Sequence, residues 1–180
     1  MLQTALDGMF KRIEAAFNNA FGSQWNPWYQ LGALSFYLFW IICISGLYLY
    51  VFFNTSITGA YESVQRLTVD QWYLGGVMRS LHRYASDAMA VTVTVHLVRE
   101  FAKGRFRGAQ SFSWISGVPL LWLLFAAGIG GYWLVWDQFA QYVAQISTEW
   151  MERLPVISDS LARTFLSNTT LSDRLFSLLV

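Results

Sequence analysis

The chain has only two histidines, and both lie in one largely apolar stretch, "LHRYASDAMAVTVTVHLVRE" at 81–100. His82 and His96 are 14 positions apart. On an α-helix this separation is a rise of about 21 Å, and the side-chain direction returns to within about 40°. The two imidazoles therefore leave one face too far apart to share a metal ion. The spacing predicts two separate planar metal cofactors stacked across a membrane, and the alternative is two histidines that only hydrogen bond to neighbouring helices.

Glycines repeat this spacing in two other stretches of the chain. Gly32 and Gly46 are 14 positions apart, and so are Gly117 and Gly131. Because glycine has no side chain, a flat ring can approach the helix backbone at these positions. Three stretches with one period predict two layers of the same bulky ligand, each with one histidine and glycines from two flanking helices. Close helix packing through small residues is the alternative for any single pair.

An arginine accompanies each histidine. Arg79 precedes His82 by three positions, and Arg99 follows His96 by three. Each guanidinium therefore lies within one helical turn of an imidazole. A porphyrin carries propionates, which favour a cationic bidentate donor, so both arginines are candidate propionate contacts. The alternative is that they extend to lipid headgroups, which suits Arg99 better than Arg79.

Membrane-spanning helices must position these residues. The chain is 55% hydrophobic and 13% charged, whereas soluble domains carry about 25% charged residues, so we expect an integral membrane protein in contact with lipid. A net charge of +1 without a basic run argues against a nucleic-acid partner. Spanning helices are expected over 29–53, 75–98 and 114–136, with a polar loop over 54–72 and the start of a fourth spanning helix over 171–180.

Residues 1–24 precede this membrane domain, which we place at 25–180. Their apolar positions recur at helical spacing, which predicts an amphipathic helix in the membrane interface, or else an ordinary surface helix. The loop after the second spanning helix is basic, with Arg99, Lys103, Arg105 and Arg107 against Glu100. The positive-inside rule then places this loop and the N-terminus in the cytoplasm, as in a bacterial inner membrane. His82 would lie towards the outer side and His96 towards the inner side.

Together these residues resemble the N-terminal half of cytochrome b of the bc1 and b6f complexes. The matching features are Gly32 and Gly46, "RSLHRYASDAMAVTVTVHLVR", Trp114 and Gly117, and "GYWLVWDQ" at 131–138, and the resemblance runs from about Trp25 to the end of the chain. The resemblance implies an all-α transmembrane four-helix bundle that binds two b hemes. His82 would ligate the outer heme iron and His96 the inner one. Arg79, Arg99, Trp114 and the four glycines would contact the hemes.

The resemblance also implies groups that these 180 residues do not supply. In the family the second axial ligand of each heme is a histidine of the fourth helix, so we expect these ligands from a continuation of that helix or from another subunit. It implies quinone chemistry near 131–138, where Val135 replaces a usual proline and Asp137 a usual glycine. Gln30 stands where the b6 branch has a cysteine that anchors an extra heme, so that heme is not expected by this route.

The function expected from the sequence is that of a diheme b-type cytochrome subunit. It would carry electrons across the membrane within a quinol- or quinone-linked respiratory or photosynthetic oxidoreductase complex. Expected partners are a chain that supplies the C-terminal half of cytochrome b, a Rieske iron–sulfur protein and a c-type cytochrome. One alternative is a cytochrome b membrane anchor of another dehydrogenase or respiratory complex without quinol bifurcation, which Val135 and Asp137 favour. Another is a non-redox membrane scaffold or transporter, although internal repeats typical of transporters are not visible.

Overall fold

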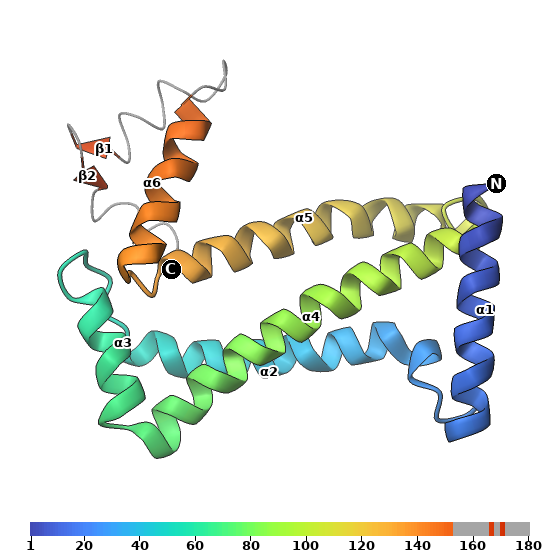
Figure 1. Ribbon diagram of the computed structural model, residues 1–180, viewed down its shortest axis with the longest axis horizontal. Helices are drawn as coiled ribbons and strands as arrows, with labels where there is room; N and C mark the ends of the chain where they lie inside the picture. Colours follow the sequence, from blue (N-terminus) through green and yellow to red (C-terminus); the bar gives the residue numbers. More distant parts are fainter. Residues whose placement is uncertain (153–165, 168–169, 172–180) are drawn as a thin grey trace. The chain divides into compact units, whose positions relative to one another are not determined.

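The fold is all-α, as expected from the sequence. The architecture is that of a computed structural model, which describes residues 1–152, 166–167 and 170–171 (Figure 1). Its α-helices are α1 (Leu2–Phe21), α2 (Leu31–Phe52), α3 (Ala60–Val69), α4 (Val77–Ala102), α5 (Ser111–Trp133) and α6 (Gln138–Glu152). Short helical turns are η1 (Pro27–Gln30), η2 (Trp72–Gly76) and η3 (Gly108–Gln110), and two-residue strands β1 (Leu166–Ser167) and β2 (Thr170–Leu171) pair antiparallel. Apart from Leu171, the fourth spanning helix predicted over 171–180 lies outside the described residues.

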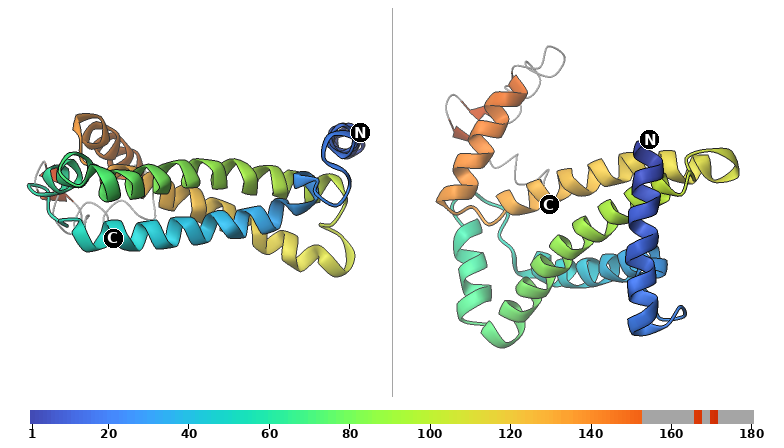
Figure 2. Two further views of the ribbon diagram at one scale, coloured as in Figure 1. Left: turned by 90° about the horizontal axis from the view of Figure 1, so that it is seen from below. Right: turned by 45° about the vertical axis from the view of Figure 1, so that its right-hand side comes forward.

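The chain divides into two compact units. The first is formed by Met1–Ile44 and Leu81–Phe125, and the second by Ser45–Ser80 and the chain from Ala126 onwards. Helices α2, α4 and α5 each contribute residues to both units. Figure 2 shows α4 as one uninterrupted helix, and both histidines of this helix belong to the first unit.

Two helical segments have the length and composition needed to cross a membrane. They are Pro27–Phe52 and Gly108–Trp133, each of 26 residues. Their large apolar side chains, such as Phe36 and Trp122, are exposed, which suits contact with lipid rather than water. Helix α4 is equally long but less apolar, because it carries the polar and charged residues that surround the histidines. A membrane crossing by this helix stays a prediction.

Helix α1 packs with its buried face against the rest of the first unit. Phe10 is buried and its ring meets Trp28 edge-on, with 5.9 Å between ring centroids. Asn26 is fully buried, and its Nδ2 donates to the Glu14 carbonyl oxygen (3.0 Å) while its Oδ1 accepts from the Trp28 amide (3.0 Å). These bonds fix the turn between α1 and η1. Because Leu2 and other apolar residues of α1 remain exposed, a location in the membrane interface stays a prediction.

The loop expected over 54–72 contains a helix, α3. Ala60, Ser63 and Leu67 are its buried residues, at intervals of three and four that place them on one face. That face packs on η2, where a Cβ at Gly75 would lie 2.5 Å from the Leu67 carbonyl oxygen. Only glycine allows this approach, so tertiary packing forms a helix in a segment whose polar composition indicates a loop.

Candidate cofactor site

The imidazole of His82 faces α2. Its Nδ1 lies 3.1 Å from the carbonyl oxygen of Ile42, and both residues belong to the first unit. A carbonyl oxygen can only accept, so Nδ1 carries the proton and the lone pair is placed on Nε2. Histidines that bind metals usually donate their other ring N–H in this way, because the bond fixes the tautomer and the ring orientation. The donor set at His82 therefore fits an iron ligand.

His96 is held differently. Its Nδ1 is buried and has no hydrogen-bond partner among the described residues. Leaving a buried polar nitrogen unpaired costs about 1–3 kcal/mol, which argues against a histidine whose purpose is to bond to a neighbouring helix. A Cβ built on Gly32 would lie 3.4 Å from Cε1 and 3.5 Å from Nε2 of this imidazole. The imidazole therefore packs against the backbone of Gly32 with the ring edge that carries Nε2 turned towards it, a close approach that the missing side chain allows.

The other glycines have different surroundings. A Cβ at Gly117 would meet the Leu97 Cδ1 atom at 3.3 Å, so Gly117 lets α5 pack closely on α4. A Cβ at Gly131 would have no atom within 4 Å, and Gly46 is half-buried on α2. Trp114 donates from its indole Nε1 to the Leu97 carbonyl oxygen at 3.2 Å. The first unit therefore brings Gly32, Gly117 and Trp114 to one stretch of α4, whereas Gly46 and Gly131 belong to the second unit.

The two candidate propionate contacts bind protein groups in this structure. Arg79 donates from Nη1 to the Thr68 hydroxyl oxygen at 2.9 Å, within the second unit. Arg99 is only 5% exposed, and its Nε and Nη2 both lie 2.7 Å from Oε1 of Glu14 on α1. Its Nη1 lies 3.3 Å from Glu100 Oε1. The guanidinium of Arg99 is therefore buried between carboxylates rather than extended towards a lipid surface.

A cavity in the second unit contains one of the residues that depart from the resemblance. Its volume is about 550 Å³, and it is lined by Ile57, Tyr61, Trp136, Asp137, Gln138, Phe139 and Gln141. Asp137 Oδ1 accepts a hydrogen bond of 2.7 Å from the Ala140 amide and so caps the N-terminus of α6. Trp136 has a positive φ of 52°, a strained conformation for an aromatic residue. The carboxylate thus lines a cavity and also supports the turn that leads into α6.

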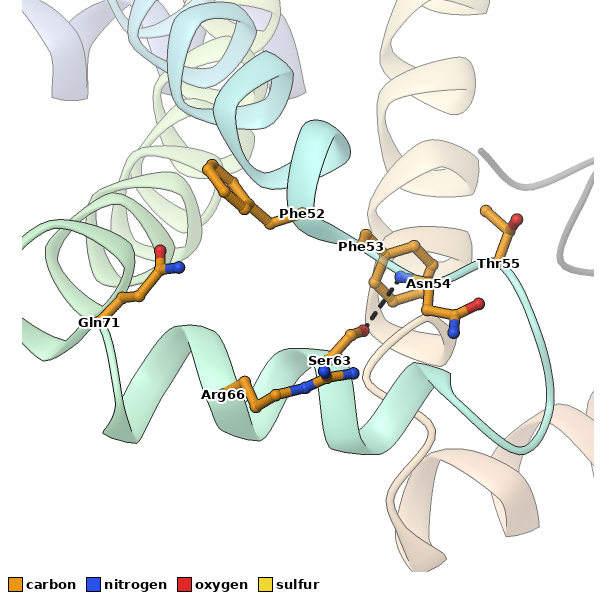
Figure 3. A pocket seen from close by; sticks show the side chains of 7 residues that line it. All are labelled: Phe52, Phe53, Asn54, Thr55, Ser63, Arg66 and Gln71. Atoms are coloured by element: carbon orange, nitrogen blue, oxygen red, sulfur yellow. Dashed lines mark hydrogen bonds between the residues drawn. The ribbon is translucent and has the colours of Figure 1, made fainter.

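A second cavity of about 370 Å³ lies within the second unit and is shown in Figure 3. It is lined by Phe52, Phe53, Asn54, Thr55, Ser63, Arg66 and Gln71. The backbone N–H of Asn54 donates to the Ser63 hydroxyl oxygen at 3.1 Å and joins the end of α2 to α3. No candidate residue from the sequence lines this cavity, so we assign it no part in cofactor binding.

Comparison with known proteins decides the family. The family model described as "Cytochrome b/b6/petB" matches residues 17–179. The chain belongs to the cytochrome b/b6 family. This confirms the resemblance predicted from the sequence, and with the two apolar helices it makes the chain an integral membrane protein. Heme b is the cofactor of this family, and the donor sets at His82 and His96 fit it.

Individual relatives agree with the family. Cytochrome b6 of Heliobacterium mobile is 30% identical over 136 residues, which cover 76% of this chain and 63% of that relative. Cytochrome b6 of Heliobacterium modesticaldum is 31% identical and that of Gracilaria tenuistipitata var. liui 29%, with the same coverage. The chain therefore matches less than two thirds of the length of these curated relatives.

Sequence reasoning did not find three groups at the site. Glu14 lies 85 positions before its partner Arg99, and only its place on the helical face of Phe10 indicates that it is buried. The Ile42 group is a backbone carbonyl, which no side-chain pattern reveals. The ring centroid of Tyr29 lies 5.6 Å from the Arg99 Cζ, a contact between distant positions that no spacing in the sequence indicates.

Proposed function

We propose that this chain is the diheme b-type cytochrome subunit that carries electrons across the membrane in a quinol-linked complex. The observation that supports this most directly is the pair of imidazoles on α4. His82 is held through Nδ1 by a carbonyl of α2, and the His96 imidazole packs against the backbone of Gly32. Two such positions about 21 Å apart along one helix suit two hemes, one near each side of a membrane.

In this proposal the bound hemes supply one-electron chemistry, and the chain supplies ligands and surroundings. His82 presents Nε2 because its other ring nitrogen donates to Ile42. Gly32 lets the His96 imidazole lie against the backbone at the start of α2, and Trp114 holds α5 against α4 one residue beyond that imidazole. This chain would supply one histidine to each heme, and any further histidine ligand would come from a continuation of the fourth helix or from another subunit. A bound heme would supply electron transfer, and His82 and His96 would each hold one heme through an imidazole nitrogen.

Quinol and partner chains belong to the same proposal. Asp137 lines an open cavity and lies in the segment 131–138 that the resemblance associates with quinol oxidation. We propose that a separate chain supplies the C-terminal half of cytochrome b, and that a Rieske iron–sulfur protein and a c-type cytochrome complete the complex. The basic loop after α4 supports a cytoplasmic N-terminus in a bacterial inner membrane.

Histidine variants test the assignment of the two hemes. In the chain purified with its native complex, His82→Ala and His96→Ala should each lose one of two b hemes, measured by reduced-minus-oxidised absorption spectra and heme content per polypeptide. Thr92→Ala is the matched control, because this half-buried residue of α4 lies between the histidines and its hydroxyl donates to the Ala88 carbonyl oxygen of the same helix. An unchanged heme content in either histidine variant would show the assignment to be wrong.

Asp137 favours a second candidate function, that of a cytochrome b anchor without quinol bifurcation. Its carboxylate lines the cavity where the family usually has glycine, and thus adds a charge to that cavity. Co-purification of a Rieske protein and quinol-dependent reduction of the hemes support the bifurcating complex. Their absence, together with two intact hemes and a dehydrogenase partner, supports the anchor.

A further inference from the structure

The end of α4 next to His96 carries a buried ion pair with α1. We propose that Glu14 is a positioning residue that lowers the reduction potential of the inner heme, meaning the heme at His96, by holding and neutralising Arg99. This inference rests on the proposed function, since it requires a heme at His96. It concerns a residue of α1 for which the sequence indicates no part in cofactor chemistry.

The geometry of the pair is tight and enclosed. Glu14 is 8% exposed and Arg99 5% exposed. One carboxylate oxygen, Glu14 Oε1, receives both Nε and Nη2 of Arg99 at 2.7 Å, and Lys103 Nζ lies 3.4 Å from the same oxygen. Asn26 fixes the backbone of Glu14 by donating to its carbonyl oxygen. The carboxylate is therefore held in one place and is shielded from water, so its charge is screened far less than that of a surface residue.

The pair lies one helical turn beyond the His96 layer. Arg99 follows His96 by three residues on α4, and Tyr29 precedes Gly32 by three residues on the opposite segment. Gly32 faces the His96 imidazole, and the Tyr29 ring lies beneath the Arg99 guanidinium, 5.6 Å from its Cζ. The two contacts are thus successive layers of the same helix pair. A charge in the layer of Arg99 and Tyr29 therefore acts on a cofactor in the neighbouring layer of His96 and Gly32.

The balance of charge gives the direction of the effect. Three cations, Arg99, Lys103 and Arg105, meet two carboxylates, Glu14 and Glu100, through contacts of 2.6–3.4 Å. Removing the charge of Glu14 doubles the net positive charge of this cluster. Reduction adds an electron to the heme, so a more positive neighbourhood favours the reduced form and raises the potential. His82 lies 17 residues before Arg99, about 26 Å away along α4, so the outer heme should respond less.

The test is a redox titration of both b hemes in the native complex. Glu14→Gln keeps the shape and an oxygen acceptor but removes the charge. At the ambient potential where the wild-type inner heme is half reduced, its reduced-to-oxidised ratio should rise by about threefold or more, with a smaller change at the outer heme. Glu14→Asp keeps the charge and should shift the ratio less. Asp7→Asn is the matched control, since Asp7 lies on the same helix and pairs with exposed Lys11.

Further measurements separate this effect from a purely structural one. If Glu14→Gln makes α1 sensitive to protease while both potentials stay unchanged, Glu14 is only an anchor and the inference is wrong. An equal shift at both hemes also overturns it. If the complex that carries Glu14→Gln does not assemble, the Lys103→Met variant provides the test. Loss of this cation should lower the reduction potential of the inner heme. An unchanged or raised potential of that heme overturns the inference. Wild-type protein with no b heme would refute the proposed function itself, whereas two normal hemes without the shift refute only this inference.

Discussion

Gly32 is the position where a single added group tests the inner cofactor layer most sharply. A Cβ there would lie 3.4 Å from Cε1 and 3.5 Å from Nε2 of His96, which is within ordinary contact distance. Alanine should therefore fit beside the imidazole. The methyl groups of valine extend about 1.5 Å further and would push the His96 imidazole out of its position, so that Nε2 would no longer be placed to hold an iron. Overpacking of this kind costs about 1–3 kcal/mol, which corresponds to a roughly 5- to 150-fold weaker binding of the heme.

We expect Gly32→Ala to keep both hemes and Gly32→Val to lose the inner heme selectively. The assay is heme content per polypeptide in membranes with limiting heme, combined with a redox titration that distinguishes the two hemes. Gly128→Val on α5 is the control, because a Cβ at Gly128 would meet no atom within 4 Å. The reasoning is refuted if Gly32→Val retains both hemes with an unchanged inner potential, or if the outer heme is lost instead.

Two further predictions concern the supports of the site. Asn26→Ala removes the hydrogen bonds to the Glu14 carbonyl oxygen and the Trp28 amide, so the packing of α1 should weaken by about 2–3 kcal/mol. Amide hydrogen exchange in α1 should become faster, and unchanged protection would contradict this. Asp137→Ala removes the cap on the Ala140 amide and should destabilise α6 by about 1 kcal/mol, measured by exchange at its first turn, whereas Asp137→Asn should preserve protection there.

The sequence predicted the parts of the site that depend on spacing along a helix. His82 and His96 share α4, and Gly32 faces His96 as the common period predicts. A helix has a fixed rise and rotation, so residue separation alone determines which side chains share a face. The same logic identified the family, because two histidines and two glycine pairs with one spacing form a specific pattern.

The sequence could not predict contacts between distant segments. The ion pair of Glu14 and Arg99 joins α1 to α4 and forms only when both helices are placed. Their burial was also difficult to predict, since charged side chains are rarely buried unless they are paired, and the pairing depends on the tertiary structure. The polar composition of 54–72 indicated a loop, but packing of Leu67 against η2 stabilises a helix there. In each case tertiary contacts outweigh local preference.

The central claim is that one helix holds two b hemes, one at each histidine. Heme content per polypeptide, combined with a redox titration of the intact wild-type complex, tests this most directly. The account predicts two b hemes for each copy of this chain and two separate one-electron transitions. A single heme, or a complex without b heme, would contradict it.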